Sequence, residues 1–154
     1  MIPRSAFDET FREKAIKNGY DAKAVKFFER VLGDYPKLGI RIGRKFAFRP
    51  PRMVMVGPYE PSFQLLFLHE VGHAISGHRN FKTDIERLKI EVEAWSEARK
   101  LASLYGVEMD EELVQSELDT YRDWLHQKSR CPKCGLTRFQ TPDSIYHCPL
   151  CDQL

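Results

Sequence analysis

The chain has 154 residues, of which 42% are hydrophobic and 30% are charged. This length fits one ordinary globular domain with a small appendage, and a formal net charge of +2 gives no bulk electrostatic argument for nucleic-acid binding. No apolar run approaches the roughly 20 residues of a membrane span, and the N-terminal residues soon become charged. We therefore expect a cytoplasmic protein with no membrane segment.

Capping residues and apolar periodicity predict five helices and a small sheet. The predicted helices span residues 5–17, 21–32, 62–76, 83–105 and 110–127. The predicted strands span residues 40–42, 45–48 and 53–56. We expect an α+β fold, in which a mostly helical domain with a small β-sheet fills residues 1–128. A short cysteine-containing module follows at residues 129–154.

The segment that carries the predicted strands is strongly basic. No acidic residue lies between Asp34 and Glu60. The basic residues in between are Lys37, Arg41, Arg44, Lys45, Arg49 and Arg52. A solvated loop is the simpler interpretation, and a surface that binds nucleic acid or a partner protein is the alternative.

Residues 69–73 read His-Glu-Val-Gly-His, an H-E-x-x-H motif in a segment predicted to be helical. Positions i and i+4 lie on one face of a helix, so His69 and His73 can both reach one metal ion. Glu70 projects next to the same face and is placed to take a proton from a water molecule on the metal. The motif therefore predicts a zinc site with Glu70 as the general base.

A catalytic zinc needs a third protein ligand and one open position. The remaining histidines are poor candidates: His78 is expected to point away at the end of the helix, His126 is distant, and His147 lies among the cysteines. A carboxylate from the next helix is the better candidate.

The helix predicted at 83–105 offers three such carboxylates, Glu91, Glu93 and Glu97. Its apolar arc consists of Leu88, Val92, Trp95, Ala98 and Ala102. Glu91 falls near the middle of this arc, where an unpaired charge would be costly and zinc would be its partner. We favour Glu91 as the third ligand and keep Glu93 as the alternative.

His69 to His73, followed on the next helix by Glu91, Ala94 and Ala98, resembles the Glu-zincin metallopeptidases, and within them the small ImmA/IrrE-type enzymes. The resemblance covers about residues 20–105. It implies zinc at His69, His73 and Glu91, with Glu70 as the base. Glu97 stands where that family carries an aromatic residue.

All four cysteines lie in the last 24 residues, as two C-x-x-C pairs separated by thirteen residues. The cysteines are Cys131, Cys134, Cys148 and Cys151. Four thiolates at this spacing satisfy tetrahedral zinc and resemble a zinc ribbon. A module of this size cannot fold on its own core, so the metal would supply the folding energy.

These patterns predict a zinc metallopeptidase with one catalytic and one structural Zn²⁺, acting on a protein or peptide substrate. A second electrophile is often needed, and Tyr59, Tyr121 and His126 are candidates that the sequence does not rank. The alternative is a non-catalytic zinc-binding regulator, or a protein similar to the SprT-like proteases, which pair H-E-x-x-H with a terminal zinc ribbon near DNA. In that case the ribbon and the basic segment would bind nucleic acid or a partner protein.

Overall fold

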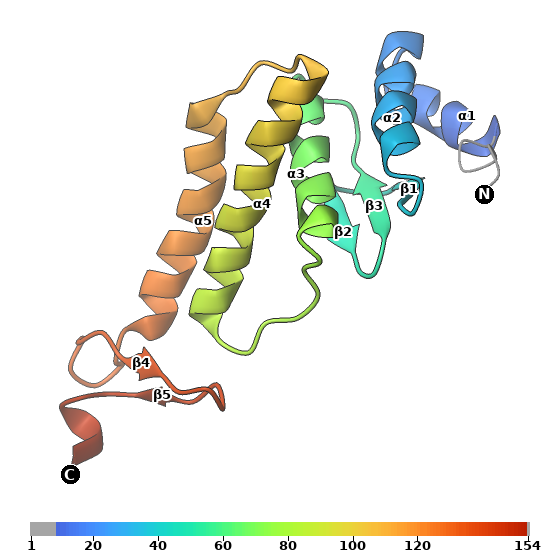
Figure 1. The fold of residues 1–154 in the computed structure, drawn as a ribbon. Helices are drawn as coiled ribbons and strands as arrows, with labels where there is room; N and C mark the ends of the chain where they lie inside the picture. The colour runs from blue at the N-terminus through green and yellow to red at the C-terminus, as the bar shows by residue number, and fades with distance from the viewer. Residues whose placement is uncertain (1–8, 154) are drawn as a thin grey trace. The chain divides into compact units, whose positions relative to one another are not determined.

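A computed structural model describes residues 9–153 of the chain (Figure 1). The helices are α1 (Glu9–Lys17), α2 (Ala22–Asp34), α3 (Phe63–Ile75), α4 (Asp84–Tyr105) and α5 (Glu111–Ser129). The strands are β1 (Gly39–Ile42), β2 (Ala47–Arg49), β3 (Met53–Val56), β4 (Phe139–Gln140) and β5 (Tyr146–His147). The predicted α+β class, mostly helical with small sheets, is confirmed. No helix in the described part of the chain is long and apolar enough to cross a membrane.

The chain forms two compact units, residues up to 79 with 94–109, and residues 80–93 with the segment from 110 onward. Helix α4 contributes its first half to the second unit and its second half to the first. Helix α5 groups with the cysteine module rather than with the sheet. The predicted boundary at residue 128, which rests on composition, stays a prediction.

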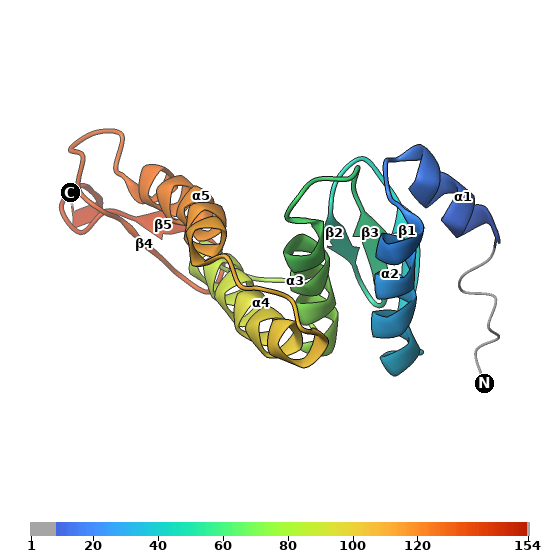
Figure 2. The ribbon, with the colours of Figure 1, turned by 90° about the horizontal axis from the view of Figure 1, so that it is seen from above.

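The first unit is built around a three-stranded sheet in the order β1-β3-β2. Strand β1 is parallel to the central strand β3, and β2 pairs with β3 in the antiparallel direction. Helix α3 contacts β2 and β3, whereas α1 contacts β1 (Figure 2). Ile40, Val54 and Phe48 are in register, so they share one face of the sheet.

A cluster of aromatic rings holds α2 against α3. Phe28 is fully buried and its ring centroid lies 4.8 Å from that of Phe67, in an edge-to-face arrangement. Tyr20 and Phe63 add similar contacts at 5.3 Å. Each such pair stabilises packing by about 0.5–1.5 kcal/mol beyond its buried area. The cluster therefore fixes the start of α3, the helix that carries the H-E-x-x-H motif.

In the second unit, α5 lies beside the first half of α4 and their contact is organised by Arg87. Its guanidinium lies over the rings of Tyr121 at 5.5 Å and Trp124 at 4.9 Å. Asp110 caps the start of α5, where its side chain accepts from the Leu113 backbone N–H at 3.0 Å. Glu86 likewise accepts from the backbone N–H groups that precede α4.

Most observed element bounds differ from the expected ones by one or two residues. The second helix, expected to end at residue 32, includes Gly33 and continues to Asp34. The helix ends where Tyr35 precedes Pro36, because a residue before proline avoids the helical conformation. The expected start of the first helix at residue 5 lies outside the described residues.

Candidate metal sites

The first candidate site depends on a very close approach of α3 to α4. A Cβ atom built on Gly72 would lie 2.5 Å from the carbonyl oxygen of Ala94. Ala94 itself is fully buried. Any larger side chain at position 72 would therefore push the two helices apart. The glycine inside the H-E-x-x-H motif is explained by this crossing.

His69 and His73 converge on one point beside this crossing. Both are buried, and their Nε2 atoms lie 3.1 Å apart. Two imidazole nitrogens on a tetrahedral zinc, each about 2.0–2.1 Å from the ion, would be separated by about 3.3 Å. The ring of His69 stacks on that of Trp95 at 4.3 Å, which orients it from α4. The pair therefore fits a shared metal ion through Nε2.

His78 lies against His73, contrary to the expectation that it would point away. The Nδ1 atoms of the two rings are 3.1 Å apart. The backbone N–H of His78 also donates to the carbonyl of His73 at 3.1 Å, so the chain folds back at the end of α3. His78 is thus a hydrogen-bond partner of His73 on the side away from His69. Such a partner fixes the tautomer and the orientation of a metal-binding imidazole.

Of the carboxylates that the sequence left open, Glu91 is the one beside the histidines. It is buried and lies one helical turn before Trp95 on α4. One ligand atom each from His69, His73 and Glu91 lie within 4.8 Å of one another. Glu93 is exposed, and its Oε1 atom lies 4.0 Å from Nζ of Lys89. Such a contact is typical of a solvated surface residue. A sequence-based placement of Val92 in the buried arc was wrong, since its side chain is 44% exposed.

Glu70 is also buried, next to His69 on α3. Two of the candidate electrophiles, Tyr59 and Tyr121, contact residues other than the two histidines. Tyr59 packs on Phe63, six residues before His69 and thus about 9 Å away along the helix axis. Tyr121 lies beside Arg87.

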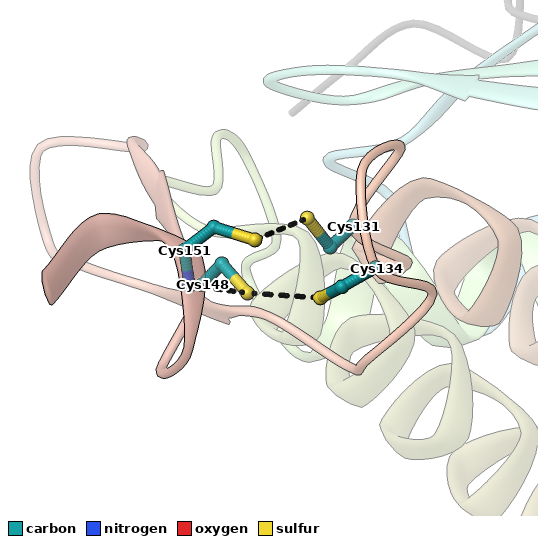
Figure 3. Close-up of side chains that lie close together, drawn as sticks. All are labelled: Cys131, Cys134, Cys148 and Cys151. Carbon is teal, nitrogen blue, oxygen red and sulfur yellow. Dashed lines mark hydrogen bonds between the residues drawn. The ribbon is translucent and has the colours of Figure 1, made fainter. Parts of the chain in front are cut away.

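The second candidate site consists of the four cysteines (Figure 3). The Sγ atoms of Cys131 and Cys151 are 3.9 Å apart, and those of Cys134 and Cys148 are 3.5 Å apart. Thiolates on a tetrahedral zinc, about 2.3 Å from the ion, would be separated by about 3.8 Å. A disulfide needs about 2.05 Å. The thiols are therefore spaced for a metal ion.

The thiols of this group influence one another's protonation. Backbone N–H groups of Cys134 and Lys133 lower the pKa of Cys131 to about 6. Hydrogen bonding with Cys134, followed by burial, raises the pKa of Cys151 to about 12. One thiolate in the group thus disfavours a second. A divalent cation would remove this conflict by stabilising all four thiolates.

The cysteine module is tied to the start of α4 through Asp84, which is buried. The backbone N–H of Asp84 donates to Gln140 at 2.6 Å, and its carboxylate accepts from the Tyr146 hydroxyl at 2.6 Å. Lys128 of α5 forms an ion pair with the same carboxylate at 2.9 Å. Burial raises the pKa of Asp84, but the bonds from Tyr146 and Lys128 outweigh it and hold the pKa below its usual value. Sequence patterns gave no sign of this anchor, because its members are far apart in the chain.

Comparisons with protein-family models, with curated proteins and with solved structures find no match to this chain. Both groups of side chains, the two histidines with Glu91 and the four cysteines, are compatible with metal binding. The chemistry of the chain is therefore inferred from these side chains and their geometry.

Proposed function

We propose that the protein is a zinc-dependent metallopeptidase whose catalytic zinc is held by His69, His73 and Glu91. The observation that carries the proposal is the convergence of these three buried side chains, whose ligand atoms lie within 4.8 Å of one another. Three protein ligands leave one coordination position open, which is the pattern of catalytic rather than structural zinc.

When bound, the zinc supplies a Lewis acid that lowers the pKa of water and polarises a peptide carbonyl. Glu70 would take a proton from the attacking water while the water oxygen bonds to the carbonyl carbon of the substrate. The same carboxyl then gives that proton to the nitrogen as the carbon–nitrogen bond breaks. Burial of Glu70 suits this role because it keeps the carboxylate out of bulk water and ready to accept a proton.

The sheet next to the site suits an extended peptide substrate. Strand β2 is an edge of the three-stranded sheet, and its Phe48 ring lies parallel to the His73 ring at 6.4 Å. An edge strand offers backbone donors and acceptors to which a peptide can add as a further strand. A substrate bound in this way would pass close to His73.

The four cysteines hold a second, structural zinc in this proposal, as a zinc ribbon. The module has only short strands and exposes the side chains of Leu136, Phe139, Ile145 and Leu150. No aliphatic or aromatic side chain is buried among the described residues of the module, so metal binding would provide the folding energy. A closed shell of four thiolates leaves no position for substrate, which separates its role from catalysis.

The direct test is the variant Glu70→Gln, assayed with zinc content measured in parallel. We expect zinc to remain bound at both sites while peptide hydrolysis falls by about 10²–10⁴-fold. Glu13→Gln makes the same chemical change at an exposed position of α1 and serves as the matched control. Hydrolysis by Glu70→Gln at the rate of the Glu13→Gln control would contradict the assignment of the base.

A further inference from the structure

The sheet beside the candidate catalytic site carries an uncompensated positive charge. Six basic side chains are exposed along the segment from residue 37 to residue 52: Lys37, Arg41, Arg44, Lys45, Arg49 and Arg52. None of the six forms an ion pair with a carboxylate among the residues that the structure describes. We call this set the basic segment. Its charge is available to a partner.

Four members of the basic segment form two groups around the sheet, and the other two, Arg44 and Lys45, lie between β1 and β2. Arg41 is in register with Met55, and Arg49 with Met53, so both arginines lie on the face opposite to Val54 and Phe48. Lys37 precedes β1, and Arg52 precedes β3. Both residues lie at the end of the sheet that is next to the C-terminal end of α3. The second group therefore lies beside the C-terminal end of the H-E-x-x-H helix.

Lys37 and Arg52 line an open cavity of about 750 Å³. Its walls also include Pro36, Leu38, Pro51 and Ile75. Ile75 comes only two residues after His73, about 3 Å further along the helix axis. Residues two apart on a helix face different sides, so the cavity and the histidines lie at the same end of α3 but on different faces of that helix. The size of the cavity is within the range of ligand sites, and its mixed apolar and cationic lining suits side chains that end in a carboxylate.

We infer that the substrate is an acidic peptide segment, with glutamate or aspartate side chains that enter this cavity and contact Lys37 and Arg52. The inference rests on the proposed peptidase function and specifies its substrate class. Acidic side chains would be attracted by the whole basic segment before binding and then pair with the two cations at the cavity.

The cavity lining carries two cations, Lys37 and Arg52, against one carboxylate, that of Asp34. Asp34, its acidic wall residue, accepts a hydrogen bond from the Tyr105 hydroxyl at 2.6 Å. The carbonyls of His73 and Ala74 at the end of α3 accept from the backbone N–H groups of His78 and Gly77, each at 3.1 Å. The negative end of the helix is thus already capped by its own chain.

A peptide fits the cavity better than a nucleic acid does. Proline and aliphatic side chains make up much of its lining, and they suit the carbon chains of glutamate or neighbouring apolar residues. The net charge of the chain is only +2, far from the broad basic surface that phosphate backbones select. Nucleic-acid binding therefore becomes an outcome of the test.

The first experiment measures binding without catalysis. Fluorescently labelled peptides of one sequence, differing only in carrying glutamate, glutamine or lysine at the variable positions, are titrated with the zinc-loaded Glu70→Gln chain. We expect the glutamate peptide to bind about tenfold more tightly than the glutamine peptide, an advantage that falls as salt is added. The double variant Lys37→Glu/Arg52→Glu should abolish or invert this order. Lys23→Glu/Lys26→Glu makes the same change of charge on the exposed surface of α2 and should preserve it.

Equal binding of the three peptides would overturn the inference, as would an acidic preference that both double variants lose equally. Displacement of the glutamate peptide by random duplex DNA at lower concentration would also overturn it, in favour of a nucleic-acid surface. The same peptides are then assayed for cleavage by the unmodified chain. Acidic preference in binding without cleavage of any peptide would contradict the peptidase proposal and leave the binding assignment standing. Cleavage of the peptides without an acidic preference in binding would overturn the acidic-substrate inference and leave the peptidase proposal standing.

Discussion

The two candidate metal sites of this protein are built in opposite ways. His69, His73 and Glu91 stand on long helices whose positions are set by apolar packing, by the Gly72–Ala94 crossing and by the stacking of Trp95 on His69. The four cysteines stand on short turns and strands with many exposed apolar side chains. Helix packing can therefore hold the first site in shape before a metal arrives. We expect the second site to need a bound metal in order to fold.

The largest expected effect of breaking either site is loss of the cysteine module. Cys148 is buried, and Cys148→Ser would remove one of four thiolates from a site whose metal supplies about 10–16 kcal/mol in comparable small zinc modules. We expect the structure from residue 130 onward to be lost while α2, α3 and the sheet keep their fold. Hydrogen exchange resolved by segment measures this directly. Protection of the module at the level of the unmodified chain would contradict its dependence on metal.

Gly72→Ala tests whether helix packing shapes the histidine site. The added methyl would meet the Ala94 carbonyl at 2.5 Å and force α3 and α4 apart. We expect a loss of about 1–3 kcal/mol in unfolding free energy, together with weaker zinc binding at the histidines. Gly33→Ala serves as the control, since it also lies in a helix and a methyl there would meet nothing within 4 Å. Equal stability of the two variants would show that the crossing is not tight.

Replacement of His78 tests the contact that orients His73. Loss of a hydrogen-bond partner of this kind weakens metal binding by about 10–100-fold. We expect His78→Phe to weaken zinc binding at the histidine site by that factor, and His78→Asn to restore part of it by accepting the same hydrogen bond. Competition with a chromogenic chelator gives the two affinities. Equal zinc binding by both variants and the unmodified chain would remove His78 from the site.

The smallest expected effect concerns Asp84, the anchor of the cysteine module on α4. Asp84→Asn loses the ion pair with Lys128 but keeps an acceptor for Tyr146, so we expect a cost of about 1 kcal/mol. The pKa of Asp84 is lower in the folded state than in the unfolded chain. Its stabilising contribution is therefore present above the usual carboxyl pKa and is lost as pH falls through the folded value.

Denaturant unfolding of the second unit at several pH values checks this sign. The difference in stability between the unmodified chain and Asp84→Asn should be constant near neutral pH and shrink in the acid range below about pH 4. A difference that grows on acidification would contradict the direction of the shift.

Local patterns predicted much of this molecule. The capping residues before α4 and α5 and the apolar lead-in to His69 are short-range features, and the helices that they indicated are present. Projection of the sequence onto a helix placed Glu91 within the apolar arc and Glu93 toward its edge. In the structure Glu91 is buried and Glu93 is exposed. The same projection failed for Val92, because it indicates direction on a helix and not how far the neighbouring helices extend.

Features that depend on distant parts of the chain were beyond such patterns. The parallel pairing of β1 with β3, skipping β2, is set by how the segments pack and not by any local signal. The return of His78 onto His73 requires the left-handed conformation of Gly77, with φ of 68°, which redirects the chain after α3. Asp84 meets Gln140 and Tyr146 across more than 50 residues of sequence.

The central claim is that two histidines and one carboxylate hold a zinc ion with one side open. A crystal structure of the zinc-loaded chain, with anomalous scattering recorded at the zinc edge, tests it most directly. We predict two anomalous peaks, one among the four cysteines and one bound by the Nε2 atoms of His69 and His73 and by Glu91, with a non-protein ligand in the fourth position. A histidine site without a peak, or an ion enclosed there by four protein atoms, would contradict the account.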